Sequence, residues 1–228
     1  MFKNVKVLRK EENLENKYSS PSIEEKLKSS RLIPLGVIEI NAYSSLAPII
    51  ISGGKEKEFT LYVGLSSLNN IFTEVKYLEE PQFLKNHPFV TMKAKNEKNE
   101  DIIVIGIDDN KNYLCKDKGI NLFEKNELSE TFEEKLQNTK KLESQRILSK
   151  EIIKELEKYD LLQDQSFNLR INGEIKPIID GYFIVNRTKL NNLDDKIIAL
   201  WTKKGWMGII DAHIYSLRNF QKLVELIK

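Results

Sequence analysis

The sequence predicts an α+β fold in which a sheet-rich first half, with mixed or antiparallel strands, packs with a helix-rich second half that contains a β-hairpin. Three observations favour this class. Short runs of apolar and β-branched residues dominate up to about residue 125, as expected of strands. Beyond that point, apolar residues recur every three or four positions, which is typical of amphipathic helices. Within the second half, an alternating stretch followed by Asn172 and Gly173 predicts the hairpin.

The length of 228 residues fits one large domain or two small ones that share an interface. We predict a single compact unit, 1–228, with a sheet-rich part at about 1–125 and a helix-rich part at about 126–228. Apolar residues make up 40% of the chain and charged residues 31%, so the chain can build a core and is too apolar for a disordered protein.

The strands expected in the first half are bounded by polar or Gly-containing turns. They cover residues 5–8, 31–35, 37–40, 47–51, 59–65, 89–94 and 102–107. Gly53 and Gly54 predict a hairpin between the fourth and fifth of these strands. Pro34 suits an edge strand, and the continuous apolar run 102–107 is typical of the middle of a sheet. Short helices are expected at 23–28 and, after Pro81, at 81–86.

Helical patterns predict two helices at the start of the second half, 131–146 and 150–158. Ser129 or Thr131 can cap the first helix, and Ser149 can cap the second. The hairpin follows, with strands at 167–171 and 175–185 joined by a type I′ turn at Asn172 and Gly173. A further helix is expected to start at Asp194, whose carboxylate is predicted to cap it, and to end at Gly205.

The last helix is predicted to run to Ile227 and to pack its apolar face on the rest of the protein. That face consists of Ile210, Ile214, Leu217, Phe220, Val224 and Ile227, spaced by three or four. His213 lies on or beside this face, three residues after Ile210 and four before Leu217. The predicted architecture depends on this tail folding back onto the body.

Charge, cysteine content and hydropathy exclude several classes of protein. The net charge of +2 comes from 36 basic and 34 acidic residues, which gives no long-range field to attract nucleic acid. Cys115 is the only cysteine, so neither an intrachain disulfide nor a thiolate zinc site can form. The N-terminus lacks the apolar core of a secretory signal, and no apolar run reaches the ~20 residues of a membrane helix. We therefore expect a cytoplasmic protein without membrane insertion.

No spacing typical of a metal or cofactor site is present. The two histidines, His87 and His213, are isolated, so no metal ligand set is predicted. The glycines fit neither a phosphate-binding loop nor a dinucleotide-binding motif, so no cofactor is predicted. His213 is either a core-edge imidazole bonded to a neighbouring polar group or a polar group at a pocket or partner surface. The second interpretation allows an enzyme in which His213 is the acid/base and Asp108 or Asp211 its partner.

Other candidates also have a structural and a functional interpretation. Cys115 could act as a nucleophile with His213, but its neighbours lack the features of such cysteines, and a half-buried strand-end thiol is favoured. Asp108 ends an apolar strand, where a carboxylate can contact a ligand. Trp201 and Trp206 flank Gly205 and are large enough to anchor a core or an interface.

Taken in order, several segments resemble the SapC family, named for a protein encoded with a bacterial surface-layer (S-layer) system. They are Asn69-Asn70-Ile71-Phe72, the stretch from Pro81 to Phe89, Ile105-Gly106-Ile107-Asp108, Leu122-Phe123, Asp180 to Val185 with Leu190 to Leu193, and Gly205 to Asn219. The last segment resembles the family's Ala-His-x-x-Ser-Leu-x-Asn block. The segment before Asn69 matches weakly, and the stretch 74–78 lacks a frequent Trp.

The resemblance implies association with S-layer protein production, type I export or surface display, and it implies no catalytic mechanism. We therefore expect an accessory protein that binds protein or peptide, with the S-layer protein or type I secretion components as partners. The predicted binding residues are Phe72, Phe89, Asp108, Trp201, Trp206, His213, Ser216 and Asn219. The alternative is an enzyme acting on a peptide or small molecule through His213.

Overall fold

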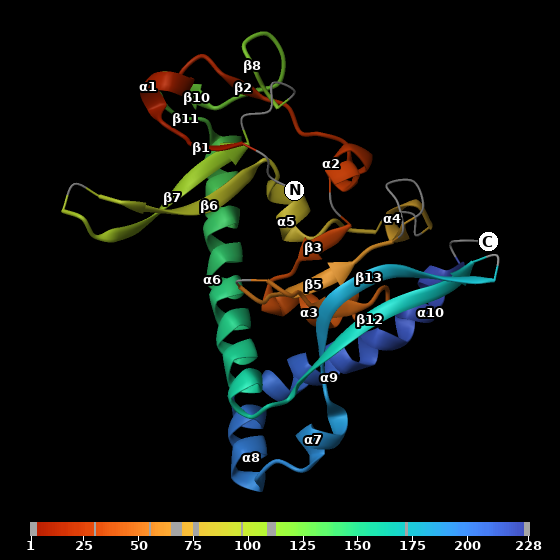
Figure 1. Ribbon diagram of the computed structural model, residues 1–228. Helices are drawn as coiled ribbons and strands as arrows, with labels where there is room; N and C mark the ends of the chain where they lie inside the picture. The colour runs from red at the N-terminus through yellow and green to blue at the C-terminus, as the bar shows by residue number, and fades with distance from the viewer. Residues whose placement is uncertain are drawn as a thin grey trace. The chain divides into compact units, whose positions relative to one another are not determined.

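The computed structural model describes residues 4–29, 31–54, 56–64, 70–74, 78–96, 98–108, 113–171 and 173–225 (Figure 1). Within them, helices accompany sheets whose strand pairs are antiparallel, so the predicted α+β class is confirmed. The chain divides into two compact units. Unit 1 comprises Met1–Ser30 and Gln82–Ser144, and unit 2 comprises Arg31–Pro81 and Gln145–Lys228. The two units do not coincide with the sheet-rich and helix-rich parts expected to meet at about residue 125, because strands far apart in the sequence pair within each unit. The single domain over 1–228 stays a prediction.

Unit 1 is built on a three-stranded antiparallel sheet. Its order is β1 (Val5–Val7), β7 (Asp101–Asp108) and β6 (Phe89–Lys95). The apolar run predicted to be a central strand is β7, which pairs with β1 on one side and with β6 on the other. The prediction from its continuous hydrophobicity is therefore confirmed.

Short elements complete unit 1. They are α1 (Lys10–Asn13), β2 (Lys17–Tyr18), α2 (Ile23–Ser29), α5 (Gln82–Asn86), β8 (Leu114–Cys115), β9 (Ile120–Asn121), β10 (Phe123–Glu124) and β11 (Glu127–Leu128). Strand β2 pairs with both β8 and β9, and β10 pairs with β11. The core of the unit consists of Tyr18, Phe89, Ile107, Leu122 and Phe132. The aromatic rings of this core are tilted relative to one another, with the centroid of Phe89 5.1 Å from that of Tyr18 and 5.0 Å from that of Phe132.

Unit 2 contains a five-stranded antiparallel sheet. Its order is β12 (Leu162–Ile171), β13 (Glu174–Val185), β4 (Ile49–Ile51), β5 (Phe59–Tyr62) and β3 (Leu32–Pro34). Both predicted hairpins, β4 with β5 and β12 with β13, are confirmed. Pro34 lies in edge strand β3, as expected. Leu65, Asn172 and Ile227, each part of a predicted element, lie outside the described residues.

The predicted strand at 37–40 is wrong. Residues Val37–Glu39 form a 3-10 turn, η1, and Ile40–Tyr43 form helix α3. A mostly apolar segment of only four residues also fits one helical turn, in which Val37 and Ile40 share a face. Both of these side chains are buried, whereas Ile38 is 70% exposed. The Glu39 carboxylate accepts from the backbone N–H of Gly36 at 2.9 Å, which stabilises the start of the turn.

The two helices predicted at 131–146 and 150–158 are a single helix, α6 (Glu130–Lys158). Ser129 caps it, because its Oγ accepts from the backbone N–H of Phe132 at 3.3 Å. The predicted second cap, Ser149, lies inside the helix and is buried. No glycine or proline occurs between residues 130 and 158, so nothing in the chain stops the helix at Ser149.

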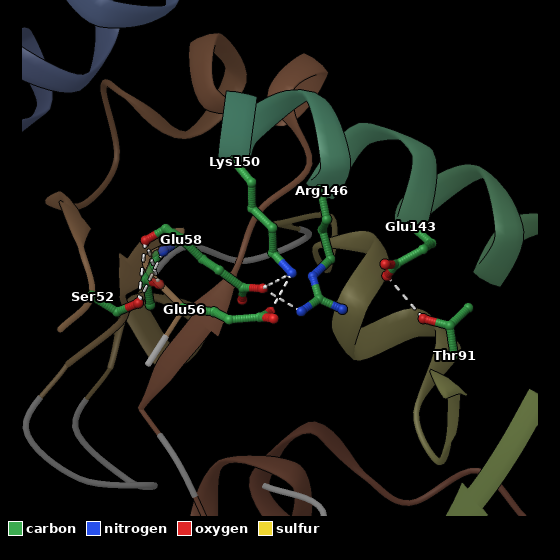
Figure 2. A network of polar contacts seen from close by, with 8 residues as sticks. Ser52, Glu56, Glu58, Thr91, Glu143, Arg146 and Lys150 are labelled. Atoms are coloured by element: carbon green, nitrogen blue, oxygen red, sulfur yellow. Dashed lines mark hydrogen bonds and ion pairs between the residues drawn. The ribbon is translucent and has the colours of Figure 1, made fainter. Parts of the chain in front are cut away.

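Within unit 2, ion pairs join the second half of α6 to the loop between β4 and β5 (Figure 2). Arg146 pairs with Glu58, and both side chains are largely buried. Lys150 Nζ lies 2.5 Å from Glu56 and 3.6 Å from Glu58, while Lys57 lies 2.6 Å from Glu157. These contacts hold residues 56–58 of the predicted hairpin against the helix.

Among the described residues, the single helix predicted after Gly205 is replaced by α9 (Trp206–Ser216), the 3-10 turn η2 (Leu217–Asn219) and α10 (Phe220–Glu225). Earlier in unit 2 lie α4 (Ile71–Glu74), α7 (Arg187–Asn191) and α8 (Asp195–Lys203), of which α8 is the helix predicted to start at Asp194. As predicted, Asp194 caps α8, its carboxylate accepting from the N–H of Lys196 at 2.7 Å. Figure 1 shows α9 and α10 (blue) running beside β12 and β13, and Phe220 of α10 stacks on Phe167 of β12. The tail therefore folds back onto the sheet, as the prediction required.

Candidate functional site

Three polar side chains on the inner face of the tail are completely buried. They are His213 and Ser216 of α9 and Asn219 of η2, each three residues after the last. In a straight α-helix such residues drift around the axis, whereas a 3-10 turn has three residues per turn. The turn η2 therefore keeps Asn219 on the side of Ser216. We call these three residues the tail clamp.

Two side chains of the tail clamp take the place of a missing part of the sheet. Strands β13 and β4 pair at Phe183 and Ile51, so the same antiparallel register brings Val185 opposite Ile49. At that position the N–H of Val185 donates to Nε2 of His213 at 3.1 Å. The N–H of Ile49 donates to Oγ of Ser216 at 2.8 Å. Helix α9 thus satisfies backbone groups that a longer β4–β13 ladder would otherwise pair.

The imidazole of His213 is neutral in this position. Burial lowers the pKa of His213 to about 4, and the carbonyl of Ile49 opposes that effect. Since Nε2 accepts a hydrogen bond, the proton of the neutral ring belongs on Nδ1. Nδ1 makes no hydrogen bond of regular geometry among the described residues, although the carbonyl of Ile49 raises the pKa of the ring. The ring of Phe59 covers it, with centroids 5.7 Å apart.

The other two clamp residues hold the chain just before β4. Ser216 Oγ donates to the carbonyl of His213 at 2.6 Å, which orients its oxygen toward the N–H of Ile49. Asn219 Nδ2 donates to the carbonyls of Ser44 at 2.8 Å and Ala47 at 3.4 Å. The clamp therefore joins segments more than 160 residues apart in the chain.

The structure does not place His213 in an open pocket with an acidic partner. Its ring is completely buried and bonded to backbone, whereas Asp211 is exposed and pairs with Arg187 at 3.2 Å. A general acid/base must reach a substrate, directly or through one water. The hypothesis of an enzyme built on His213 and Asp211 therefore loses its geometric basis, and the interpretation of His213 as a structural imidazole fits.

The aromatic candidates of unit 2 lie mostly in its interior. Trp201 and Trp206 are buried, with their ring centroids 6.2 Å apart, and Tyr159 packs edge-on against Trp201 at 5.7 Å. Phe72 of α4 is half-buried. The two tryptophans thus anchor α8 and α9 within unit 2. A role of these residues in binding a partner stays a prediction.

In unit 1, the candidates Phe89 and Asp108 are buried as well. Phe89 belongs to the core of the unit. Asp108 Oδ1 accepts from the N–H of Asn4 at 3.4 Å, and the N–H of Asp108 donates to the carbonyl of Pro88 at 3.1 Å. The carboxylate at the end of β7 therefore helps to fix the N-terminal strand, and contact with a ligand stays a prediction.

Sequence reasoning missed the electrostatic and ring contacts that connect Asp108 with Tyr113, Tyr113 with His87, and His87 with Lys26. Tyr113 packs edge-on against His87 at 5.0 Å, and burial together with Asp108 raises the pKa of Tyr113. Burial, reinforced by Lys26, lowers the pKa of His87 to about 4. No spacing in the sequence connects α2, the start of β6 and the end of β7, so only the fold brings these residues together. Cys115 is half-buried, and its thiol donates to the carbonyl of Lys118.

Some site classes find no support in the described parts of the chain. There, no three side chains of His, Cys, Asp or Glu come together as a metal site. Among the same residues, every helix is too short or too polar to cross a membrane.

The comparison with known families decides the assignment. The SapC family model matches residues 16–223 of the 228. The chain belongs to the SapC family. No curated protein and no solved structure matches it. In this SapC protein, the tail clamp secures the fold of unit 2, because its three polar side chains bond to backbone groups of distant segments.

Proposed function

We propose that this SapC-family protein is a cytoplasmic accessory factor that binds protein or peptide in S-layer protein production, type I export or surface display. The family match over residues 16–223 carries the proposal. The burial of His213 counts against the alternative of an enzyme that uses this residue as acid/base, because its ring already bonds to backbone.

The outer face of α9 offers the binding surface of unit 2. Tyr215 is 48% exposed, and the guanidinium of Arg218 stacks on its ring at 3.6 Å. Leu200 of α8 is also exposed. Tyrosine and arginine are enriched among the residues that dominate protein interfaces, and a stacked pair is already ordered before binding. We propose that this face contacts the exported surface-layer protein.

We expect Tyr215→Ala and Arg218→Ala to abolish partner capture while leaving the fold intact. Tagged protein would be isolated from its native cells, and bound proteins identified by mass spectrometry. The wild type should recover the S-layer protein or subunits of its transporter. Ile147→Ala, a change at an exposed apolar residue of α6, is the matched control and should capture as the wild type does. Recovery of neither partner by the wild type contradicts the proposal.

Gly208 on the same face gives a separate prediction. It lies exposed in the first turn of α9, and a Cβ built there would meet nothing within 4 Å among the described residues. Gly208→Ala should therefore raise the free energy of unfolding by about 0.5 kcal/mol, because alanine loses less backbone entropy. Urea denaturation measures this change. If the partner packs closely against the helix at Gly208, the added methyl group should weaken capture of the partner. Unchanged capture would place the contact elsewhere on the face.

A further inference from the structure

Strand β12 forms an open edge of the sheet in unit 2. Strand β12 is the first in the strand order β12-β13-β4-β5-β3. Figure 1 shows it as a long strand beside β13. Along β12, alternate residues direct their N–H and C=O groups away from β13, and no described residue bonds to them. Such a row of backbone groups fits another extended strand.

The other open edges carry features that block pairing, whereas β12 does not. Strand β3 has three residues and includes Pro34. The part of β13 beyond β4 contains Pro177, whose nitrogen must lie on the side away from β12 because proline cannot donate to a ladder. The register shifts of the hairpin add residues to β13, so β12 itself runs ten residues without proline or insertion. Pairing is therefore open along β12.

We propose that β12 pairs with β12 of a second copy of this chain, antiparallel across a twofold axis at Phe167. Side chains at 164, 166, 168 and 170 are exposed on one face, and those at 165, 167 and 169 are half-buried on the other. For the exposed side chains of both strands to lie on the same face of the joined sheet, even-numbered residues must pair with even-numbered residues. With the axis at Phe167, Asp164 lies opposite Arg170 of the partner subunit, and Ser166 lies opposite Asn168 of the partner subunit.

Charge complementarity selects this arrangement. Twofold symmetry makes the Asp164–Arg170 pair occur twice in one interface. Within the described residues, neither Asp164 nor Arg170 forms an ion pair, so both charges are free to pair across the axis. Opposite charges directly across neighbouring strands stabilise pairing, and like charges oppose it. The result is a continuous ten-stranded sheet formed by two units 2.

Charge-reversal variants test this dimer directly. Asp164→Arg and Arg170→Asp each place two pairs of like charges across the axis, and each should raise the dimer dissociation constant about tenfold or more. The double variant restores both pairs and should dimerise as the wild type does. An equimolar mixture of the two single variants should form a heterodimer, because each chain then supplies the charge that the other lacks. Sedimentation velocity at low ionic strength measures all four samples.

Each result decides the proposal. Both residues are exposed, so circular dichroism should show unchanged folding in every variant. A wild type that stays monomeric at its highest soluble concentration overturns the proposal, and so does a single variant that dimerises as strongly as the wild type. A double variant or a mixture that fails to associate overturns the assigned register. None of these outcomes depends on the S-layer proposal.

Discussion

Replacing His213 with alanine is expected to lower the free energy of unfolding by about 3–4 kcal/mol, measured by urea denaturation followed by circular dichroism. The change leaves the N–H of Val185 buried without the acceptor that lies 3.1 Å away in the wild type. It also removes a completely buried ring that packs against Phe59, and it leaves a cavity between α9 and the sheet. Both effects destabilise the folded state.

The neighbouring Asp211→Ala is the matched control. Asp211 lies on the same helix but is exposed, and its ion pair with Arg187 is open to water. Its replacement should change the free energy of unfolding by less than about 0.5 kcal/mol. If His213→Ala were as stable as Asp211→Ala, His213 could not be the acceptor that satisfies the N–H of Val185. The stabilising role assigned to the tail clamp would then be wrong.

The sequence predicts best where local pattern and tertiary environment agree. The Asn-Gly signal located the β12–β13 hairpin, since Ile171 pairs with Glu174 across a two-residue loop. Asp194 was correctly predicted to cap α8. The pattern fails at Val37–Glu39, because a mostly apolar segment of four residues fits a strand and a helical turn equally well. It also fails at Ser149, because a serine can start a helix or lie buried within one.

For the candidate functional residues, the sequence predicted the position of His213 but not the groups to which the clamp bonds. Helical spacing placed His213 on or beside the buried face of the tail, and in the structure the residue is completely buried. The groups that bond to the clamp, the N–H groups of Val185 and Ile49, come from two strands that end their pairing at this point. No local pattern states where a ladder between distant strands stops. The spacing of three from His213 to Asn219 becomes informative only once that gap in the sheet is known.

Acidification should destabilise the protein between pH 6.5 and about pH 4, with His213 as a principal cause. In the unfolded chain His213 takes up a proton near its ordinary pKa of 6.5, while burial holds its folded-state pKa at about 4. Between these values the unfolded state binds the extra proton, so stability falls as pH falls. The integrated loss from His213 is about 3 kcal/mol, complete below the folded-state pKa.

His213→Gln isolates this contribution, because glutamine keeps an acceptor for the N–H of Val185 and does not titrate. Its free energy of unfolding should depend less steeply on pH between 4 and 6.5 than that of the wild type. The difference in slope should correspond to at most one proton bound on unfolding. His87→Gln is the matched comparison, since burial lowers the pKa of His87 to about 4 as well. Carboxylates titrate in all three proteins and cancel in the differences. An identical pH dependence for His213→Gln and the wild type would mean that His213 is protonated in the folded protein, and a protonated Nε2 cannot accept from Val185.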